Sequence, residues 1–305
     1  MSAMLRAPRC LALCLLLGAP PAAHAGAGAD KGWGPLIDRL VADGVARERA
    51  ERVFADPRMP PFTGLEFSGR TPREPASRYR GFLRPAGVAA ARRCLSLHAD
   101  AFEAAAARGV PASVLAAIMT VESACGRSTG SSVVLYRLAR LAMANDPQNL
   151  AENLARLRDT VEPGRVAERA RYLEETFYPE VRATFTMADR LGLDPLDLRG
   201  SEAGAFGYPQ FLPRNYLEAG VDGDGDGRVS LFDDFDAAAS CANFLVQHGW
   251  RPDLGTSARR GVLWEYNRSE AYVDTVLTLA RRIEAPGRQV ASRRRPRQRA
   301  RHHTT

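Results

Sequence analysis

The chain of 305 residues is 45% apolar, as expected for a folded globular protein, and it carries a formal net charge of +7. Seven arginines in residues 285–305 and two in residues 1–25 account for this excess, so the body between them is slightly acidic and offers no basic stripe for nucleic acid. Lys31 is the single lysine, which excludes a P-loop and a lysine Schiff base deep in the chain. Only His98 and His248 lie in the body, which argues against a multi-histidine zinc site. We expect no organic cofactor.

The first 25 residues are typical of a secretory signal peptide. Two arginines precede an apolar run over residues 11–19, and the small-x-small pattern Ala-His-Ala ends at Ala25. We expect cleavage after Ala25 and export to the periplasm as a soluble protein. A lipid anchor on Cys14 is the disfavoured alternative, because a leucine precedes it where a lipoprotein signal has a small residue.

Beyond this leader, the hydrophobic pattern has a 3.6-residue period almost throughout, and alternating strand patterns are scarce. The expected fold class is therefore mainly α. The spacing predicts helices over residues 33–55, 83–108, 111–125, 132–145, 148–158, 165–191, 236–249 and 270–284.

Residues 56–80 contain five prolines, which exclude a continuous helix there. We expect a linker or a wrapping loop at this place. The chain would then consist of an N-terminal helical segment with its proline-rich linker over 26–80, and a main domain over 81–284.

The helix predicted over 111–125 carries a candidate catalytic group. Glu122 lies in its last turn, at the edge of an apolar stripe and shortly before Gly126. Partial burial and the negative end of the helix dipole both disfavour the carboxylate anion. Glu122 is therefore a candidate for an acid that donates a proton near neutral pH, although spacing alone fits an ordinary surface glutamate more often.

Residues 200–216, GSEAGAFGYPQFLPRNY, are glycine-rich and aromatic and are unsuited to a helix. Taken alone, the segment favours a tight structural turn with core aromatic residues. The alternative is a binding loop in which glycines allow close approach and flat rings stack on sugars. Those rings belong to Phe206, Tyr208, Phe211 and Tyr216.

Residues 222–236, DGDGDGRVSLFDDFD, have the spacing of an EF-hand-like calcium loop. Carboxylates at alternate positions converge on one point, and hard oxygen ligands select Ca²⁺. We expect a structural calcium ion, and the alternative is a solvated acidic turn without metal. The expected ligands are Asp222, Asp224, Asp226, the backbone carbonyl of Arg228, and either Asp233 at position 12 or Asp236 by a longer closure.

The tail over 285–305, with its run SRRRPRQRARHH, is too polar and too charged to form a core. We expect a disordered, solvated extension. Binding to anionic envelope polymers is the less common alternative.

Once the leader is removed, three cysteines remain: Cys94, Cys125 and Cys241. At most one disulfide forms, and one thiol stays free. The sequence leaves the pairing open.

Five segments follow one another in a specific order. They are FLRPAGVAAAR from Phe82, GVPASVLAAIMTVESACG from Gly109, the loop 200–216, the acidic loop followed by DAAASCANFLVQHGW, and WEYNRSEAYVDTVLTLA near the end. Together, over about residues 33–284, they resemble the lytic transglycosylases of the membrane-bound B type, soluble forms included, a peptidoglycan-cleaving family. The resemblance implies a lysozyme-like, goose-type-like α-helical catalytic domain over 81–284.

The resemblance also implies that Glu122 is the single acid/base and that a set of residues lines or adjoins the glycan cleft: Ser201, Tyr208, Gln210, Phe211, Asn243, Phe244, Tyr266 and Asn267. Three departures from the family pattern concern sugar preference rather than the acid. Cys125 stands where the family commonly has an aromatic residue, Arg214 and Asn215 replace two serines, and Phe244 replaces a frequent tyrosine.

Ordinary glycosidases use two carboxylates, whereas the loop expected to face Glu122 offers only Glu202. A lone acid suits a substrate that supplies its own nucleophiles. Glu122 would protonate the oxygen between N-acetylmuramic acid and N-acetylglucosamine, the 2-acetamido group would stabilise the cationic centre, and the C6 hydroxyl would close onto C1. The product is a 1,6-anhydromuramoyl end.

Two alternatives remain open: a hydrolytic muramidase with the same acid, and a non-catalytic, calcium-dependent peptidoglycan-binding protein. A dockerin-like role would require a second calcium loop, which the sequence lacks. We expect glycan strands as the partner and a monomeric protein.

Overall fold

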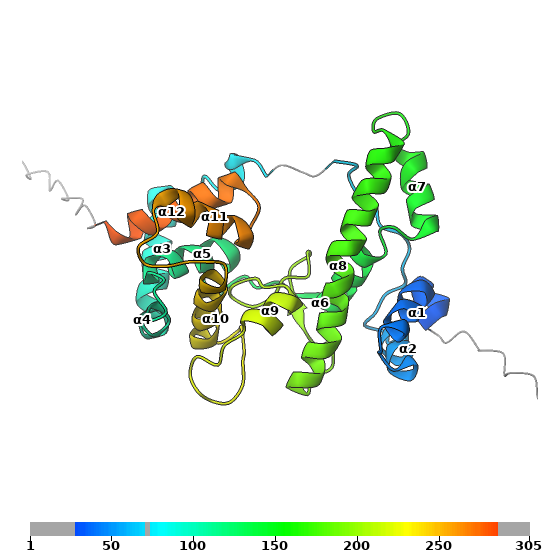
Figure 1. Ribbon diagram of the computed structural model, residues 1–305, viewed down its shortest axis with the longest axis horizontal. Helices are drawn as coiled ribbons and strands as arrows, with labels where there is room; N and C mark the ends of the chain where they lie inside the picture. Colours follow the sequence, from blue (N-terminus) through cyan, green and yellow to red (C-terminus); the bar gives the residue numbers. More distant parts are fainter. Residues whose placement is uncertain (1–27, 71–73, 286–305) are drawn as a thin grey trace, which may run out of the picture.

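The computed structural model describes residues 28–70 and 74–285, and the expected signal peptide and arginine-rich tail lie outside these residues. The helices form two groups side by side (Figure 1). One group contains α3 (Pro85–Leu97), α4 (Ala99–Ala106), α5 (Ala112–Ser123), α10 (Asp234–Gln247), α11 (Thr256–Tyr266) and α12 (Glu270–Glu284). The other contains α1 (Gly34–Ala42), α2 (Arg47–Ala55), α6 (Val134–Ala142), α7 (Pro147–Leu157) and α8 (Pro163–Leu191), and α9 (Pro213–Ala219) lies between the groups, in contact with both α8 and α10.

Helix α5 is the centre of the first group and packs against α3, α4, α10 and α12. Its residues from Ser113 to Thr120 are all buried, so it is apolar on every side rather than along a stripe. A buried Leu or Ile side chain contributes roughly 1.5–3 kcal/mol to stability. This packing fixes the helix whose last turn carries Glu122.

A two-stranded antiparallel ladder joins the turn after α5 to the segment after α8. Strand β1 (Ser132–Val133) pairs with β2 (Arg199–Gly200) in the register Ser132 to Gly200. Gly130, at φ +91°, approaches Gly200 so closely that a Cβ would lie 2.1 Å from its carbonyl oxygen. The ladder therefore brings the loop 201–211 beside the end of α5.

The N-terminal segment is tied to the rest of the protein by core packing. Trp33 is fully buried against Phe54, Phe62 and Tyr136, the last of them on α6. It belongs to the same core cluster as the buried residues of α5. The proposed division of the chain near residue 80 stays a prediction, but the segment before it shares the main core.

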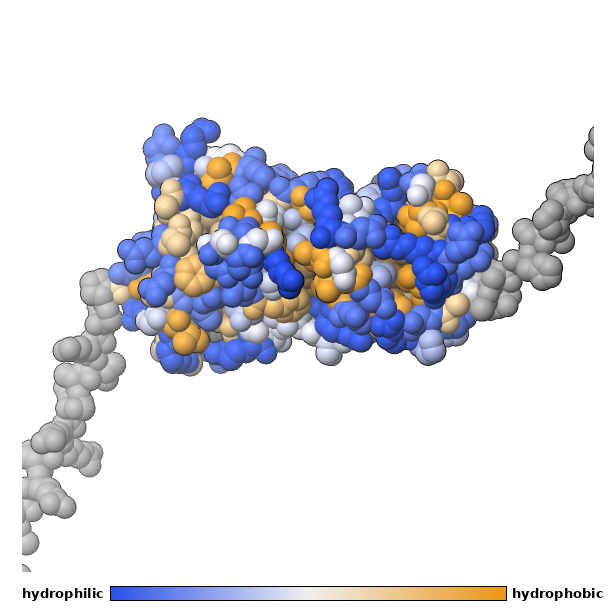
Figure 2. Space-filling model, turned by 90° about the horizontal axis from the view of Figure 1, so that it is seen from below, coloured by the Kyte–Doolittle hydropathy of each residue, from blue (hydrophilic) through white to orange (hydrophobic). Residues whose placement is uncertain are grey.

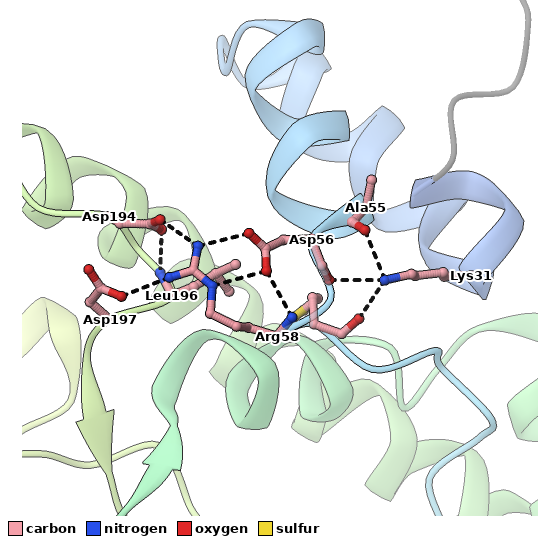
Figure 3. A network of polar contacts seen from close by, with 8 residues as sticks. Lys31, Ala55, Asp56, Arg58, Asp194, Leu196 and Asp197 are labelled. Carbon is pink, nitrogen blue, oxygen red and sulfur yellow. Dashed lines mark hydrogen bonds and ion pairs between the residues drawn. The ribbon is translucent and has the colours of Figure 1, made fainter.

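A polar network reinforces this attachment (Figure 3). The Lys31 ammonium donates to the carbonyls of Ala55, Asp56 and Met59 and so satisfies the end of α2. Arg58 forms ion pairs with Asp56, Asp194 and Asp197 at distances of 2.8, 2.6 and 2.7 Å. Asp194 and Asp197 lie in the connection from α8 to β2, so Arg58 anchors the segment that leads into the loop 201–211.

Two of the predicted helices are each divided in two. The helix predicted over 33–55 is interrupted at Asp43–Ala46, where Gly44 adopts φ +96°. The helix predicted over 83–108 breaks at His98, whose ring nitrogen Nδ1 lies 2.7 Å from the carboxylate of Asp234 on α10. Both breaks depend on backbone geometry or partners that periodicity does not record.

Two helices were not predicted. Helix α9 begins at Pro213, and the buried Glu180 of α8 accepts the amide hydrogen of Arg214, which caps the new helix from outside. Helix α11 buries only Val262 and Leu263, so its apolar pattern is too short to recognise. The remaining helices begin and end within a few residues of the prediction, and α12 has the predicted bounds.

The proline-rich linker is largely non-helical, as predicted, apart from one 3₁₀ turn at Ala76–Arg78. Its extended part lies along α7, where the buried amides of Asn149 and Asn153 bond the backbone of Leu65 and Phe67. The described part of the linker is therefore a wrapping loop held by hydrogen bonds.

No helix in the described ranges has the length and apolar character to cross a bilayer. The face seen from below is largely hydrophilic, with hydrophobic residues in small separate patches (Figure 2). Such scattered patches are normal for the surface of a globular protein.

Candidate active site

Glu122 lies in the last turn of α5, where the fully buried part of the helix gives way to a half-buried position. Burial raises the pKa of its carboxyl group to about 7; the Tyr272 hydroxyl acts in the opposite direction, as does Arg78, and the charge of Glu74 adds to the increase. The carboxyl group is therefore protonated in a substantial fraction of molecules at neutral pH. This matches the predicted environment of Glu122.

Tyr272 comes from the first turn of α12 and is 1% exposed. Among the described residues, the Tyr272 hydroxyl has no hydrogen-bond partner. It nevertheless lies close enough to the Glu122 carboxyl group for each to shift the pKa of the other. Because a buried hydroxyl without a partner is costly, a bond to the Glu122 carboxyl is the obvious means of satisfying it. Sequence reasoning missed Tyr272, although the residue lies within the fifth family segment.

The linker supplies a second carboxylate near Glu122. The Tyr79 hydroxyl donates a short hydrogen bond to Oε2 of Glu74, and Arg78 pairs with Oε1 at 3.1 Å. The Tyr79 ring packs edge-on against Tyr272 at a centroid distance of 6.1 Å. No sequence signal indicated this cluster, because the segment reads only as a proline-rich loop.

The turn after α5 is cross-linked to α3. Cys125 forms a disulfide with Cys94, with their Cα atoms 5.8 Å apart, which settles the pairing that the sequence left open. Of the cysteines in the described residues, Cys241 remains as a buried thiol, and burial raises its pKa to about 12.

Three residues of the predicted binding loop form a compact turn next to α5. The Ser201 hydroxyl accepts the amide hydrogen of Ala205, and Gln210, at φ +51°, donates from Nε2 to Gly207 at 2.9 Å and to Thr129 at 3.2 Å. The structure brings Ser201 and Gln210 to the segment that follows Glu122. The ring of Tyr208 lies against Gly126 in the same segment.

The other aromatic residues of the loop are packing residues. Phe206, Phe211 and Tyr216 are 3%, 1% and 7% exposed, so their faces are covered by protein. Their burial agrees with the tight structural turn with core aromatic residues that the segment, taken alone, favours, rather than with the alternative of rings that stack on sugars. Of the four aromatic residues in the loop, Tyr208 retains partial exposure.

Within the loop, the Phe211 ring points into the protein and packs against Phe244 and Tyr266 at centroid distances of 5.5 and 5.9 Å. The Tyr266 hydroxyl donates to the carbonyl of Pro209 at 2.7 Å and thereby holds the loop in place. Direct glycan contacts by these three residues stay predictions, and their packing favours a supporting role.

The two predicted asparagines lie on different helices. The amide of Asn243 on α10 donates to the carbonyl of Ala219 at the end of α9, so its donor group links the two helices. Asn267 is the half-buried residue that ends α11. Their roles in glycan binding stay predictions.

The acidic loop between α9 and α10 brings three carboxylates together. One carboxylate oxygen from each of Asp222, Asp224 and Asp226 lies within 4.8 Å of the others. Gly225 and Gly227 adopt positive φ values, and their amides donate to Asp222, which folds the loop tightly around these groups. The geometry fits a hard divalent cation.

The two candidates for closing the shell are placed differently. Asp233 caps α10, since its Oδ1 accepts the amide hydrogens of Phe235 and Asp236. Asp236 is buried and accepts from the amides of Gly223 and Ser230, so it links the two ends of the loop. The Arg228 amide donates to Oδ1 of Asp226 at 2.8 Å, so Arg228 belongs to the same tight loop, and the role of its carbonyl as a ligand stays a prediction.

The helical fold is that of lytic transglycosylases of known structure. The calcium complex of the Escherichia coli lytic transglycosylase Slt35 matches with a TM-score of 0.60 and 23% identity, covering 82% of this chain and 91% of that one. The Pseudomonas aeruginosa protein SltB3 in complex with NAG-anhNAM-pentapeptide matches with a TM-score of 0.60 and 21% identity, covering 84% and 79%.

The family model described as "Transglycosylase SLT domain" matches residues 29–261, and the chain belongs to this family. It is 37% identical over 142 residues to the membrane-bound lytic murein transglycosylase B of Escherichia coli strain K12. That match covers 47% of this chain and 32% of the relative, so the similarity spans about a third of the relative's length.

Proposed function

We propose that the protein is a peptidoglycan lytic transglycosylase that cleaves the β-1,4 bond between N-acetylmuramic acid and N-acetylglucosamine and leaves a 1,6-anhydromuramoyl end. The observation that carries the proposal is Glu122, a half-buried carboxyl group at the end of α5 whose pKa is raised to about 7. Membership of the SLT domain family and the sugar complex of SltB3 support the substrate class.

Glu122 acts first as an acid and then as a base. Its proton passes to the glycosidic oxygen, the C1–O bond breaks, and N-acetylglucosamine leaves with a free hydroxyl. The muramoyl 2-acetamido group stabilises the cationic centre at C1. The Glu122 carboxylate then takes the proton of the C6 hydroxyl as that oxygen bonds to C1, which regenerates the acid without consuming water.

The environment of Glu122 supports this route over hydrolysis. Ordinary glycosidases use a second carboxylate to activate water or to attack the sugar. Both oxygens of Glu74 are bonded to its neighbours Arg78 and Tyr79, and Glu202 is paired with Arg137 and Ser132. Both carboxylates are engaged by these partners, which favours a route that needs no second carboxylate.

Product analysis tests the proposal directly. The purified protein is incubated with sacculi in ¹⁸O-labelled water, and the released muropeptides are analysed by mass spectrometry. We expect anhydro products that are one water lighter than reducing ends and carry no label. Labelled reducing ends would identify a muramidase, and binding without release would identify a non-catalytic protein.

We further propose that the mature protein acts in the periplasm as a monomer on glycan strands. The Cys94–Cys125 disulfide supports export, because such bonds persist in oxidising compartments. A role for the arginine-rich tail in binding anionic polymers belongs to the same proposal and lies outside the described residues.

The acidic loop is proposed to hold a structural Ca²⁺ through Asp222, Asp224, Asp226, the carbonyl of Arg228 and one further aspartate. Convergent carboxylates and the calcium complex of Slt35 support this choice of ion. The ion would offset the repulsion between the carboxylates and fix the connection between α9 and α10. It takes no part in the chemical step.

Calcium is expected to raise thermal stability. An ion that binds only the folded state stabilises it by about 2.7 kcal/mol at a hundredfold excess over its Kd. Scanning calorimetry with calcium and with chelator measures this shift. The double substitution D224A and D226A should remove the shift, whereas Asp253→Ala, at an exposed aspartate outside the loop, should leave it intact. Equal melting temperatures of the wild type with calcium and with chelator would contradict the proposed site.

A further inference from the structure

The turn that ends α5 has an unusual backbone. Ala124, Cys125 and Gly126 adopt φ values of 50°, 62° and 76°, so three consecutive residues are left-handed. Helices commonly end in one left-handed residue, which is usually glycine because a Cβ disfavours this conformation. Here two residues with side chains take it directly after the turn that carries Glu122.

Contacts hold this turn from three directions. The disulfide ties Cys125 to Cys94 on α3. The Ser123 hydroxyl donates to the carbonyl of Tyr208 at 2.8 Å and accepts the Gly126 amide hydrogen at 2.9 Å. The Tyr208 ring covers Gly126 so closely that a Cβ there would lie 2.3 Å from it.

Among the side-chain contacts, the disulfide acts directly on Cys125, a left-handed residue that carries a side chain, and the Cys125 amide also donates to the carbonyl of Met119 at 2.9 Å. Cys94 and Cys125 are 3% and 8% exposed, so the bond lies inside the protein. It also connects the end of α5 to the helix that follows the Glu74–Tyr79 cluster. The disulfide therefore ties the turn that follows Glu122 to α3, the helix that begins shortly after the Glu74–Tyr79 cluster.

We propose that Cys94 and Cys125, joined as a disulfide, are positioning residues that hold the left-handed turn after α5 and thereby keep the Glu122 carboxyl group in its half-buried place beside Tyr272. The inference rests on the proposed role of Glu122. In this proposal the disulfide fixes the position of the Glu122 carboxyl group and takes no part in proton transfer.

Loss of the bond changes the surroundings of Glu122 in a predictable direction. Relaxation of Ala124 and Cys125 out of the left-handed region shifts the last turn of α5 and admits water to the carboxyl group. The titratable or charged groups that face it are Glu74, Arg78 and Tyr79 from the linker, Tyr272 from α12, Cys241 from α10 and Tyr266 from α11. The acid would move away from this set and titrate closer to an ordinary glutamate, at ~4.3.

The test compares two variants that both lack the cross-link, C94A/C125A and C94A/C125G. Turnover of soluble glycan fragments is measured from pH 4 to 9, and folding is checked by circular dichroism. For C94A/C125A we expect kcat to fall by about 10²-fold, as for a misplaced catalytic group, with KM changed by less than about twofold. The pKa above which kcat/KM falls, about 7 for Glu122 in the wild type, should decrease.

The glycine variant is the matched control, because glycine adopts positive φ without strain. It should recover part of the lost turnover and of the pKa, although it lacks the same cross-link. If the disulfide only stabilised the fold, its loss would lower the melting temperature of both variants and leave kcat and the pH profile unchanged. That result, or equal turnover of the two variants at a reduced kcat, would overturn the proposal.

If C94A/C125A does not fold, the comparison is made between the oxidised wild type and the wild type reduced with dithiothreitol, with the same kcat and pH readouts. Glu122→Gln in the oxidised protein separates this inference from the proposed function. If that variant keeps its turnover, Glu122 is not the acid and the proposed function fails. If it is inactive while C94A/C125A matches the wild type, only the positioning role fails.

Discussion

Replacing Glu122 with glutamine is expected to abolish turnover of peptidoglycan while glycan binding persists. Glutamine keeps the shape of the side chain and one acceptor, but it has no acidic proton to give to the glycosidic oxygen. Loss of a positioned general acid typically reduces the rate by about 10²- to 10⁴-fold. The rate of release of anhydro-muropeptides from sacculi measures the effect, and co-sedimentation with sacculi measures binding.

Glu103→Gln is the matched control, because this glutamate lies exposed on α4 and outside the Glu122 cluster. Its turnover should equal that of the wild type. A Glu122→Gln variant that clears sacculi at a rate near that of the wild type would show that the acid lies elsewhere.

The raised pKa of Glu122 also predicts a pH-dependent cost in stability. The carboxyl group titrates at about 7 in the folded protein and at about 4.5 in the unfolded chain, so between these values the folded state binds more protons. The free energy of unfolding therefore decreases as pH rises through this window, by about 3 kcal/mol for Glu122. Below about pH 4.5 the group is protonated in both states and the cost disappears.

Glu122→Gln removes this titration, so the variant should be more stable than the wild type above pH 7 and nearly equal to it below pH 4.5. Urea unfolding at pH 4.5, 6 and 8 measures the difference. A gap between variant and wild type that does not change with pH would mean that the pKa is not raised by folding.

The same pKa sets an upper limit to activity, because only the protonated carboxyl group can donate. The kcat/KM of the wild type should fall as pH rises through about 7. Activity that begins to fall near pH 4.5 would contradict burial as a cause that raises the pKa of Glu122.

The position of Glu74 gives the linker a role that its composition does not reveal. It brings Glu74, Arg78 and Tyr79 to the cluster around Glu122, and the negative charge of Glu74 helps to keep the acid protonated. The segment is thus part of the candidate active site as well as a connection between helical segments.

Several features of the protein could be predicted from local spacing along the chain. The bounds of α12, the position of Glu122 in the last turn of α5 and the alternation of aspartates in the acidic loop all follow from periods of a few residues. The helical class follows from the same periodicity. These features were predictable because each arises within one element, where neighbouring residues fix the geometry.

Which distant groups meet depends instead on how the helices pack together. The pairing of Cys94 with Cys125, the break at His98 opposite Asp234 and the burial of Phe211 under its loop each join segments separated by 31 residues or more, or depend on the packing of other helices. The approach of Tyr272 and Glu74 to Glu122 is of the same kind. A linear pattern records no distance between such segments, and the free energy that selects their contacts comes from burial in a common core.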